Sequence, residues 1–215
     1  MSDKLFVLLM HVIVLFTAFP IHEFAHGYIA YKLGDNTAKY SGRLTINPFA
    51  HLDLFGTILM IFAGIGWAKP VPINPNNFTK VSRKTGMALT ALAGPVSNLL
   101  MAYIGMILYK VLYYSIGASI NIAYVELILY YVIVLNIGLA IFNLLPIPPL
   151  DGSRVFSVFL DESTYFNIMR YERYIFIGLI LVMNSGIFDN FLSFLRNGMF
   201  NIMDFLTGYI ELIFA

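Results

Sequence analysis

The sequence predicts an all-α polytopic membrane protein with about five to six transmembrane or membrane-embedded helices. Hydrophobic residues make up 59% of the 215 residues and charged residues only 12%, against roughly a half and a quarter in ordinary soluble domains. A soluble chain of this composition would expose large apolar patches, whereas a bilayer accepts such a surface. Several apolar runs also reach the roughly 20 residues that a spanning helix needs. The length suits one membrane-embedded domain, residues 1–215.

Three apolar runs are long enough to span a bilayer by themselves, residues 5–31, 87–114 and 125–145. The first is too long for the apolar region of a signal peptide, and no small-residue cleavage pattern follows it. We therefore expect it to remain in the protein as a helix, kinked at Pro20.

Three shorter runs complete the membrane-embedded set. Residues 174–183 could lengthen into a span, and residues 201–215 are expected to form a final span or an interfacial helix. Residues 52–66 are short for a span and fit a re-entrant or interfacial element that protein shelters from lipid. The prediction is a core of about residues 5–160, followed by accessory helices over about residues 171–215.

The connection between the first two long runs is expected to contain short extended or β segments. Polar and apolar residues roughly alternate over residues 39–46. Residues 66–75 are punctuated by prolines, and a residue that precedes proline avoids the helical region. These two stretches are candidates for a hairpin at the membrane surface.

Basic residues predict the topology. One connection carries Lys32, Lys39, Arg43, Lys69, Lys80, Arg83 and Lys84, a second carries Arg154, Arg170 and Arg173, and residues 115–124 carry none. If residues 52–66 do not cross, the positive-inside rule puts both basic connections in the cytoplasm. If they do cross, the basic clusters split between the two sides. We favour the first arrangement, a multi-pass protein of the cytoplasmic membrane with its site on the cytoplasmic side.

Composition also excludes several kinds of site. The formal net charge is +1 and no dense basic stripe exists, so no nucleic-acid partner is expected. The chain has no cysteine, which excludes disulfides, thiolate catalysis and cysteine-based zinc or iron–sulfur sites. Any metal must be held by His, Asp or Glu.

The segment His22-Glu23-Phe24-Ala25-His26 matches the pattern H-E-x-x-H. Positions i and i+4 share a helix face, so both imidazoles can point at one ion, while Glu23 can accept a proton from a metal-activated water. Ionisable side chains inside a span cost at least about 2.5–3.5 kcal/mol each, which favours the metal-site interpretation. The alternative is a pair of neutral, hydrogen-bonded histidines with Glu23 near a headgroup. That alternative leaves the spacing unexplained.

A catalytic zinc needs a third protein ligand and an open position. The best candidate is Asp151, because three prolines end the preceding apolar run and expose the carboxylate where a span meets a polar cavity. The alternative is that Asp151 only caps the next helix. Beside an intramembrane H-E-x-x-H, we favour the ligand interpretation, with one Zn²⁺ per chain.

Three motifs in order resemble the site-2 proteases, which are intramembrane zinc metalloproteases. They are His22-Glu23-Phe24-Ala25-His26, Ala93-Gly94-Pro95-Val96-Ser97-Asn98, and Asn143-Leu144-Leu145-Pro146-Ile147-Pro148-Pro149-Leu150-Asp151-Gly152. Further stretches look like the compact bacterial or archaeal branch, which lacks PDZ and CBS domains.

The resemblance implies zinc held by His22, His26 and Asp151, with Glu23 as general base. It also implies regulated intramembrane proteolysis, in which a peptide bond in or near a substrate's transmembrane helix is cut. Unwound substrate would add as a strand to residues 42–46 or 67–73. Partners would be transmembrane protein substrates and the lipid bilayer, and a homo-oligomer is left open.

Asn98 and Asn143 are amides within apolar spans. Either could donate a hydrogen bond to the developing oxyanion or hold the unwound substrate backbone. Interhelical hydrogen bonding, which membrane helices commonly use, is an equally good interpretation of each.

Two other classes of function compete with the protease. A membrane protein that binds or transports metal ions would also place His and Asp inside spans, but the sequence offers no second set of intramembrane carboxylates for an ion in transit. A catalytically silent scaffold of the same fold has no physical need to keep Glu23 and three metal ligands.

Overall fold

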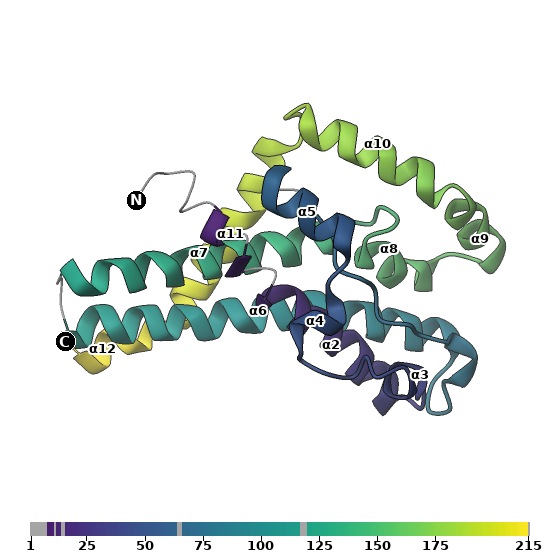
Figure 1. Cartoon of the computed structure of the whole chain (residues 1–215), viewed down its shortest axis with the longest axis horizontal. Coiled ribbons are helices and arrows are strands. Elements are labelled where there is room, and N and C mark those ends of the chain that lie inside the picture. The colour runs from purple at the N-terminus through teal and green to yellow at the C-terminus, as the bar shows by residue number, and fades with distance from the viewer. Residues whose placement is uncertain (1–7, 11, 14–15, 64–65, 117–119, 215) are drawn as a thin grey trace.

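The computed structural model describes residues 8–10, 12–13, 16–63, 66–116 and 120–214. These residues form helices and connections without a β-strand, which confirms the all-α fold class (Figure 1). The site described below lies towards one end of a long helical pair.

The helical pair consists of α6 (Arg83–Ile116) and α7 (Ile120–Asn143), which lie side by side (Figure 1). At 1.5 Å per residue, the 34 residues of α6 extend over about 51 Å. In the part of the chain that is described, these two helices alone are long and apolar enough to cross a bilayer. They correspond to the predicted spans 87–114 and 125–145.

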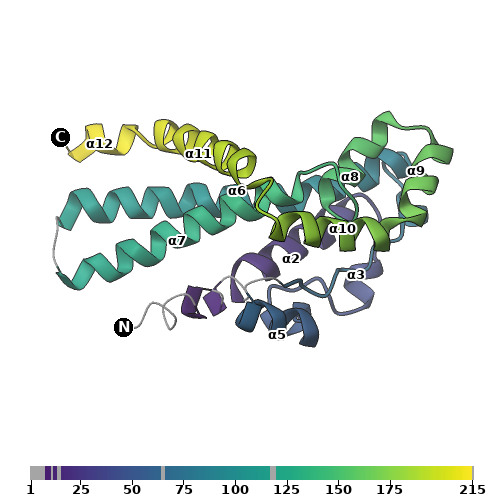
Figure 2. The same cartoon turned by 90° about the horizontal axis from the view of Figure 1, so that it is seen from above.

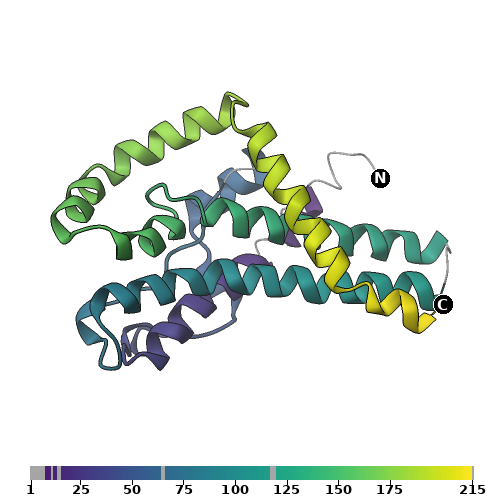
Figure 3. The same cartoon turned by 180° about the vertical axis from the view of Figure 1, so that it is seen from behind.

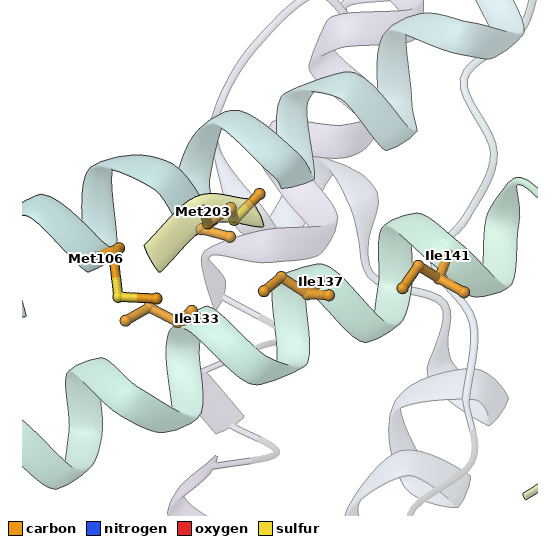
Figure 4. Close-up of a cluster of buried hydrophobic side chains, with 6 residues drawn as sticks. Met106, Ile133, Ile137, Ile141 and Met203 are labelled. Carbon is orange, nitrogen blue, oxygen red and sulfur yellow. The ribbon is translucent and has the colours of Figure 1, made fainter. Parts of the chain in front are cut away.

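A cluster of buried apolar side chains joins α6 and α7 to α11 (Asp189–Leu206), as Figure 4 shows. Its buried members are Ala102, Met106, Ile133, Ile137, Ile141 and Met203. Close van der Waals packing of this kind is what holds helices together in lipid, where the hydrophobic effect between helices is absent.

The H-E-x-x-H motif lies on α2 (Ala18–Lys32), which packs against α6. The expected run 5–31 is only partly covered, because residues 1–7, 11 and 14–15 lie outside the described residues. The expected kink at Pro20 agrees with a break in the helix just before it, because Thr17 is a turn between the helical Phe16 and the start of α2. The helix begins at Ala18, so Pro20 occupies its first turn, where a missing N–H is tolerated.

The connection between α2 and α6 is made of short helices. They are α3 (Thr37–Tyr40), α4 (Pro48–His51), α5 (Leu54–Ala63) and the 3₁₀ turn η1 (Pro75–Asn77). The predicted strand over residues 39–46 is wrong, because α3 takes its first residues and Gly42 then turns the chain at a φ of 67°. The β pairing found among the described residues is one antiparallel bridge, Leu52 to Ala68.

Helix α5 falls within the apolar run 52–66 and is only about 15 Å long. That length is about half the hydrocarbon thickness of a bilayer, as expected for an element that does not cross. Most of its apolar side chains face outward, with Leu54, Phe55, Ile58, Leu59 and Phe62 all exposed, while Ile61 packs towards Ala18 of α2.

The C-terminal part consists of α8 (Asp151–Phe156), η2 (Ser157–Phe159), α9 (Glu162–Arg170), α10 (Glu172–Asn184), α11 and α12 (Tyr209–Phe214). Helices α8 to α10 gather at the end of the molecule that also holds α2 and α3 (Figure 2). The expected single helix over residues 201–215 is wrong, because α11 ends at Leu206 and a turn separates it from α12.

Helix α11 crosses the α6–α7 pair (Figure 3). Lys110 of α6 forms an ion pair with Asp204, near the C-terminal end of α11. The buried Lys110 ammonium lies 2.7 Å from Glu211 Oε1 of α12 and 2.8 Å from Asp204 Oδ1 of α11. It also donates to the Asp204 carbonyl at 3.0 Å. A lysine inside a helix that is long and apolar enough to span a bilayer is thus compensated by two carboxylates.

Candidate metal centre and catalytic cavity

The side chains of His22, His26 and Asp151 converge on one point. The two imidazoles lie on successive turns of α2, and their Nε2 atoms are 3.0 Å apart. Oδ2 of Asp151, the first residue of α8, lies 3.1 Å from Nε2 of His22 and 3.3 Å from Nε2 of His26. The structure therefore brings together the three residues that the sequence predicted as a metal site.

This donor set fits zinc. Zinc bonds of about 2.0–2.1 Å in a tetrahedron place the ligand atoms about 3.3 Å from one another. The three observed separations of 3.0, 3.1 and 3.3 Å are close to that value. Two imidazoles and one carboxylate also leave a fourth position open, as in catalytic zinc sites.

Asp151 reaches the histidines because of the chain around it. The residue before it, Leu150, is the N-cap of α8, so the alternative that Asp151 serves as the cap is wrong. Gly152 packs against the end of α7, where a Cβ would lie 2.2 Å from the Leu144 carbonyl oxygen. Only glycine permits this close approach, which sets the position of Asp151.

Helix α6 supports the two histidines from the other side. The ring Nδ1 of His26 lies 2.7 Å from the Thr90 carbonyl oxygen, to which it donates, and this leaves the Nε2 lone pair facing the site. A Cβ on Gly94 would lie 2.4 Å from Nε2 of His26 and 2.6 Å from Cε1 of His22. Gly94 therefore allows α6 to touch both imidazoles.

Glu23 lies beside the three converging side chains but is held by a different element. Its Oε2 accepts a hydrogen bond of 2.9 Å from the backbone N–H of Val71. Val71 belongs to the proline-rich segment 66–74, which passes over α2. The Glu23 carboxylate thus forms no recorded hydrogen bond with the three converging side chains, and the Val71 N–H fixes its orientation.

Asp35 anchors the far end of the same segment. Its buried carboxylate accepts from the backbone N–H groups of Asn74, at 2.7 Å, and Thr37, at 3.0 Å. The Asn77 amide at 3.0 Å and the Thr37 hydroxyl also donate to it. Burial opposes ionisation, but these hydrogen bonds outweigh it and hold the pKa of Asp35 below its ordinary value.

A cavity of about 520 Å³ opens around the site. His22, Glu23 and His26 line it together with residues of α6, α7, α8, α10 and the segment 66–73. Trp67 and Phe176 both line it, and their rings pack edge to face with centroids 6.4 Å apart. The segment and α10 therefore form adjoining walls.

Asn98 and Asn143 both line this cavity. Asn98 is only 1% exposed, and neither polar atom of its side chain has a hydrogen-bond partner within the described chain. The Asn143 amide donates to the Leu139 carbonyl of its own helix at 3.0 Å. Neither residue makes the interhelical hydrogen bond that the sequence left as an alternative, as far as the described residues extend.

Sequence reasoning missed Thr90, Val71 and the lining residues of α10, among them Phe176. Thr90 and Val71 act through backbone groups, which residue identity does not reveal. The apolar residues of α10 resemble those of any membrane helix, so no signal in the sequence assigns them to a cavity.

Comparisons with known proteins find a peptidase family and relatives named as zinc metalloproteases. The sequence profile of Peptidase family M50 matches residues 109–184. A Bacillus subtilis (strain 168) protein named "Putative zinc metalloprotease YwhC" is 45% identical over 174 residues, which are 80% of this chain and 78% of the relative.

A more distant relative is Rip2 of Mycobacterium tuberculosis (strain ATCC 35801 / TMC 107 / Erdman), which carries the same description. It is 30% identical over 149 residues, which are 67% of this chain and 54% of the relative. No solved structure matches the chain significantly.

Proposed function

Because the chain belongs to peptidase family M50, the site-2 protease family, and is a zinc metalloprotease, we propose that it hydrolyses peptide bonds in or near transmembrane segments of other membrane proteins. The observation that carries this proposal is the convergence of His22, His26 and Asp151 beside Glu23 in one cavity. We assign the three converging residues as the ligands of one Zn²⁺ and Glu23 as the general base.

The chemistry divides between the ion and the chain. A zinc ion held by His22, His26 and Asp151 would supply Lewis-acid chemistry for the scissile carbonyl and for water. Glu23 takes a proton from the attacking water and returns it to the leaving amine. The Val71 N–H, 2.9 Å from Oε2 of Glu23, holds the carboxylate in place for both transfers.

Asn98 and Asn143 are proposed to serve the substrate. Both line the cavity, and the Asn98 amide has no hydrogen-bond partner in the described chain. An unpaired amide at 1% exposure is ready to donate to a developing oxyanion or to unwound backbone. Residues 42–46 or 67–73 are the proposed segments along which an unwound substrate lies.

The proposed setting is a bacterial cytoplasmic membrane, with five to six spanning or embedded helices in one domain. Residues 5–160 would carry the motifs and residues 171–215 would be accessory. The basic residues of the two rich connections favour a cytoplasmic active site. An ion transporter is disfavoured because the described residues contain one cluster of potential metal ligands, so no relay of sites is found there.

The test is Glu23→Gln in purified protein, with a synthetic transmembrane peptide as substrate. Hydrolysis should be lost while zinc content, measured by metal analysis, stays at one per chain, because Glu23 is not a ligand. Glu126→Gln, a matched change on α7 outside the cavity, should keep both. Full hydrolysis by Glu23→Gln would contradict the proposal, and so would a wild-type protein that cuts no membrane peptide.

A further inference from the structure

Arg154 is a charged residue of the cavity that the proposed mechanism does not use. It lies on α8 and lines the same cavity as Glu23 and the three proposed ligands. Among the described residues that line this cavity, Arg154 is the single lysine or arginine. The cavity wall is otherwise mainly apolar, so this cation stands out there.

Arg154 lies on the same face of α8 as Asp151. It follows Asp151 by three residues on a helix, which places both on one face with about 5–6 Å between their Cβ atoms. Each Cα–Cβ bond of a helix tilts towards the N-terminus. For Arg154 that direction is towards Asp151, which lies one turn nearer the start of α8.

The guanidinium of Arg154 has no partner in the described chain. The residue is half-buried, and its recorded hydrogen bond is through its backbone carbonyl, which accepts from the Ser157 hydroxyl at 2.6 Å. Glu172 also lines the cavity but forms no ion pair with it. The five N–H donors of Arg154 are therefore available to an anion that enters the cavity.

We propose that Arg154 binds a carboxylate in this cavity, an inference that rests on the hydrolysis proposed above. Hydrolysis adds water across an amide, so the carbonyl carbon gains an oxygen and becomes a carboxylate while the nitrogen leaves as an amine. A guanidinium matches a carboxylate with two parallel hydrogen bonds. The carboxylate is either this new chain end or an Asp or Glu side chain beside the scissile bond.

Three fluorescent peptides distinguish the two sources. All carry one Leu/Ala transmembrane sequence, the first ending in a free carboxylate, the second in an amide, and the third in an amide with one Asp near the end. Their dissociation constants are measured by anisotropy on zinc-loaded full-length protein that carries Glu23→Gln, which prevents cleavage. Zinc itself attracts carboxylates, so each carboxylate peptide is compared with the plain amide peptide. The preference is the ratio of their two dissociation constants, and this ratio is compared between the protein variants.

Arg154→Gln should lower the preference for one carboxylate probe by about tenfold or more, because a charge-assisted pair is lost. Arg154→Lys keeps the charge but loses the planar fork, so it should lower the preference by about threefold. A change confined to the free chain end identifies the product carboxylate, and a change confined to the Asp probe identifies a substrate side chain.

The controls separate binding from folding and from catalysis. Arg196→Gln, on α11 outside the cavity lining, should change neither preference. If Arg154→Gln fails to fold, as judged by zinc content and thermal unfolding, Arg154→Lys decides the question. Unchanged preferences for both carboxylates in a folded Arg154 variant would overturn the inference. Hydrolysis is measured separately with Glu23 intact, so a failure of the proposed function is seen independently.

Discussion

Gly94 of α6 and His26 of α2 are packed so closely that a single added carbon at Gly94 would lie 2.4 Å from Nε2 of His26. Gly94, which belongs to the second sequence motif, therefore makes room for a histidine of the first motif because it has no side chain. Moving α6 away from α2 would break the hydrogen bond of 2.7 Å between the His26 ring and the Thr90 carbonyl, which lies one turn from Gly94.

Gly94→Ala should push the His26 ring out of the site. We expect zinc affinity to fall about tenfold or more and stability to fall by about 1–3 kcal/mol, as overpacked sites do. Metal analysis and thermal unfolding measure the two effects. Gly138→Ala on α7 is the control, since nothing lies within 4 Å of a Cβ there. Normal zinc content in Gly94→Ala would show that the two helices can separate.

Asp151→Ala should remove the third ligand. Even supporting residues of zinc sites cost about 10–100-fold in affinity when changed, so we expect a loss of at least about 100-fold. A competition titration with a zinc chelator measures it. Asp189→Ala, an exposed aspartate at the start of α11, should behave as wild type. Full zinc retention by Asp151→Ala would refute the ligand assignment.

Val71→Pro should disturb Glu23 without changing the three proposed metal ligands. Proline has no N–H, so Oε2 of Glu23 loses the donor at 2.9 Å and the carboxylate is no longer held in orientation. We expect kcat to fall about tenfold with zinc content unchanged. Val71→Ala keeps the N–H and controls for lost packing. Equal kcat values in the two variants would show that the hydrogen bond is unimportant.

Asp35 should make stability depend on acid. Its pKa in the folded protein is lowered by the Thr37, Asn74 and Asn77 donors, although burial acts in the opposite direction. The carboxylate therefore stabilises the fold above about pH 3.9, its unfolded value, and that contribution is lost as pH falls through the lower folded pKa.

The measurement is thermal unfolding of wild type and Asp35→Asn between pH 2 and 7. The variant should be less stable by about 1–3 kcal/mol at pH 7, and the gap should close in acid, where the wild-type carboxylate is protonated. Thr37→Val removes one donor and should move the wild-type transition to higher pH. A gap that is constant across the whole pH range would argue against this role of Asp35.

The sequence predicts the long helices and the histidine pair well because both depend on local features. Apolar length alone identifies α6 and α7, and one helical turn brings His22 and His26 to the same face. Asp151 could also be chosen, because few carboxylates stand next to a broken apolar run.

The sequence fails where distant groups decide the structure. Polar and apolar residues alternate over residues 39–46 as in a strand, but helix α3 takes the first of these residues. Asp35 accepts a hydrogen bond from the Thr37 N–H at the start of α3 and another from Asn77, which follows α5 in the chain. The apolar run 201–215 does not reveal where α11 begins or ends. Helix α11 begins at Asp189, before that run, and polar residues interrupt the apolar sequence of the helix. Thr90 acts through its backbone carbonyl and Val71 through its backbone N–H, groups that nearly all residue types share, so the sequence gives no hint of these two roles.

The segment over the site also limits how a peptide can lie against it. Within residues 69–74, Pro70 and Pro72 have no N–H. The N–H groups of Lys69, Val71 and Asn74 already donate, respectively, to the His51 carbonyl and to the carboxylates of Glu23 and Asp35. Among the described contacts, this leaves the N–H of Ile73. What the segment offers is therefore almost entirely carbonyl oxygen. A chain aligned with it has to bring its own amide hydrogens, and a proline or N-methyl residue in that chain would forfeit the contact.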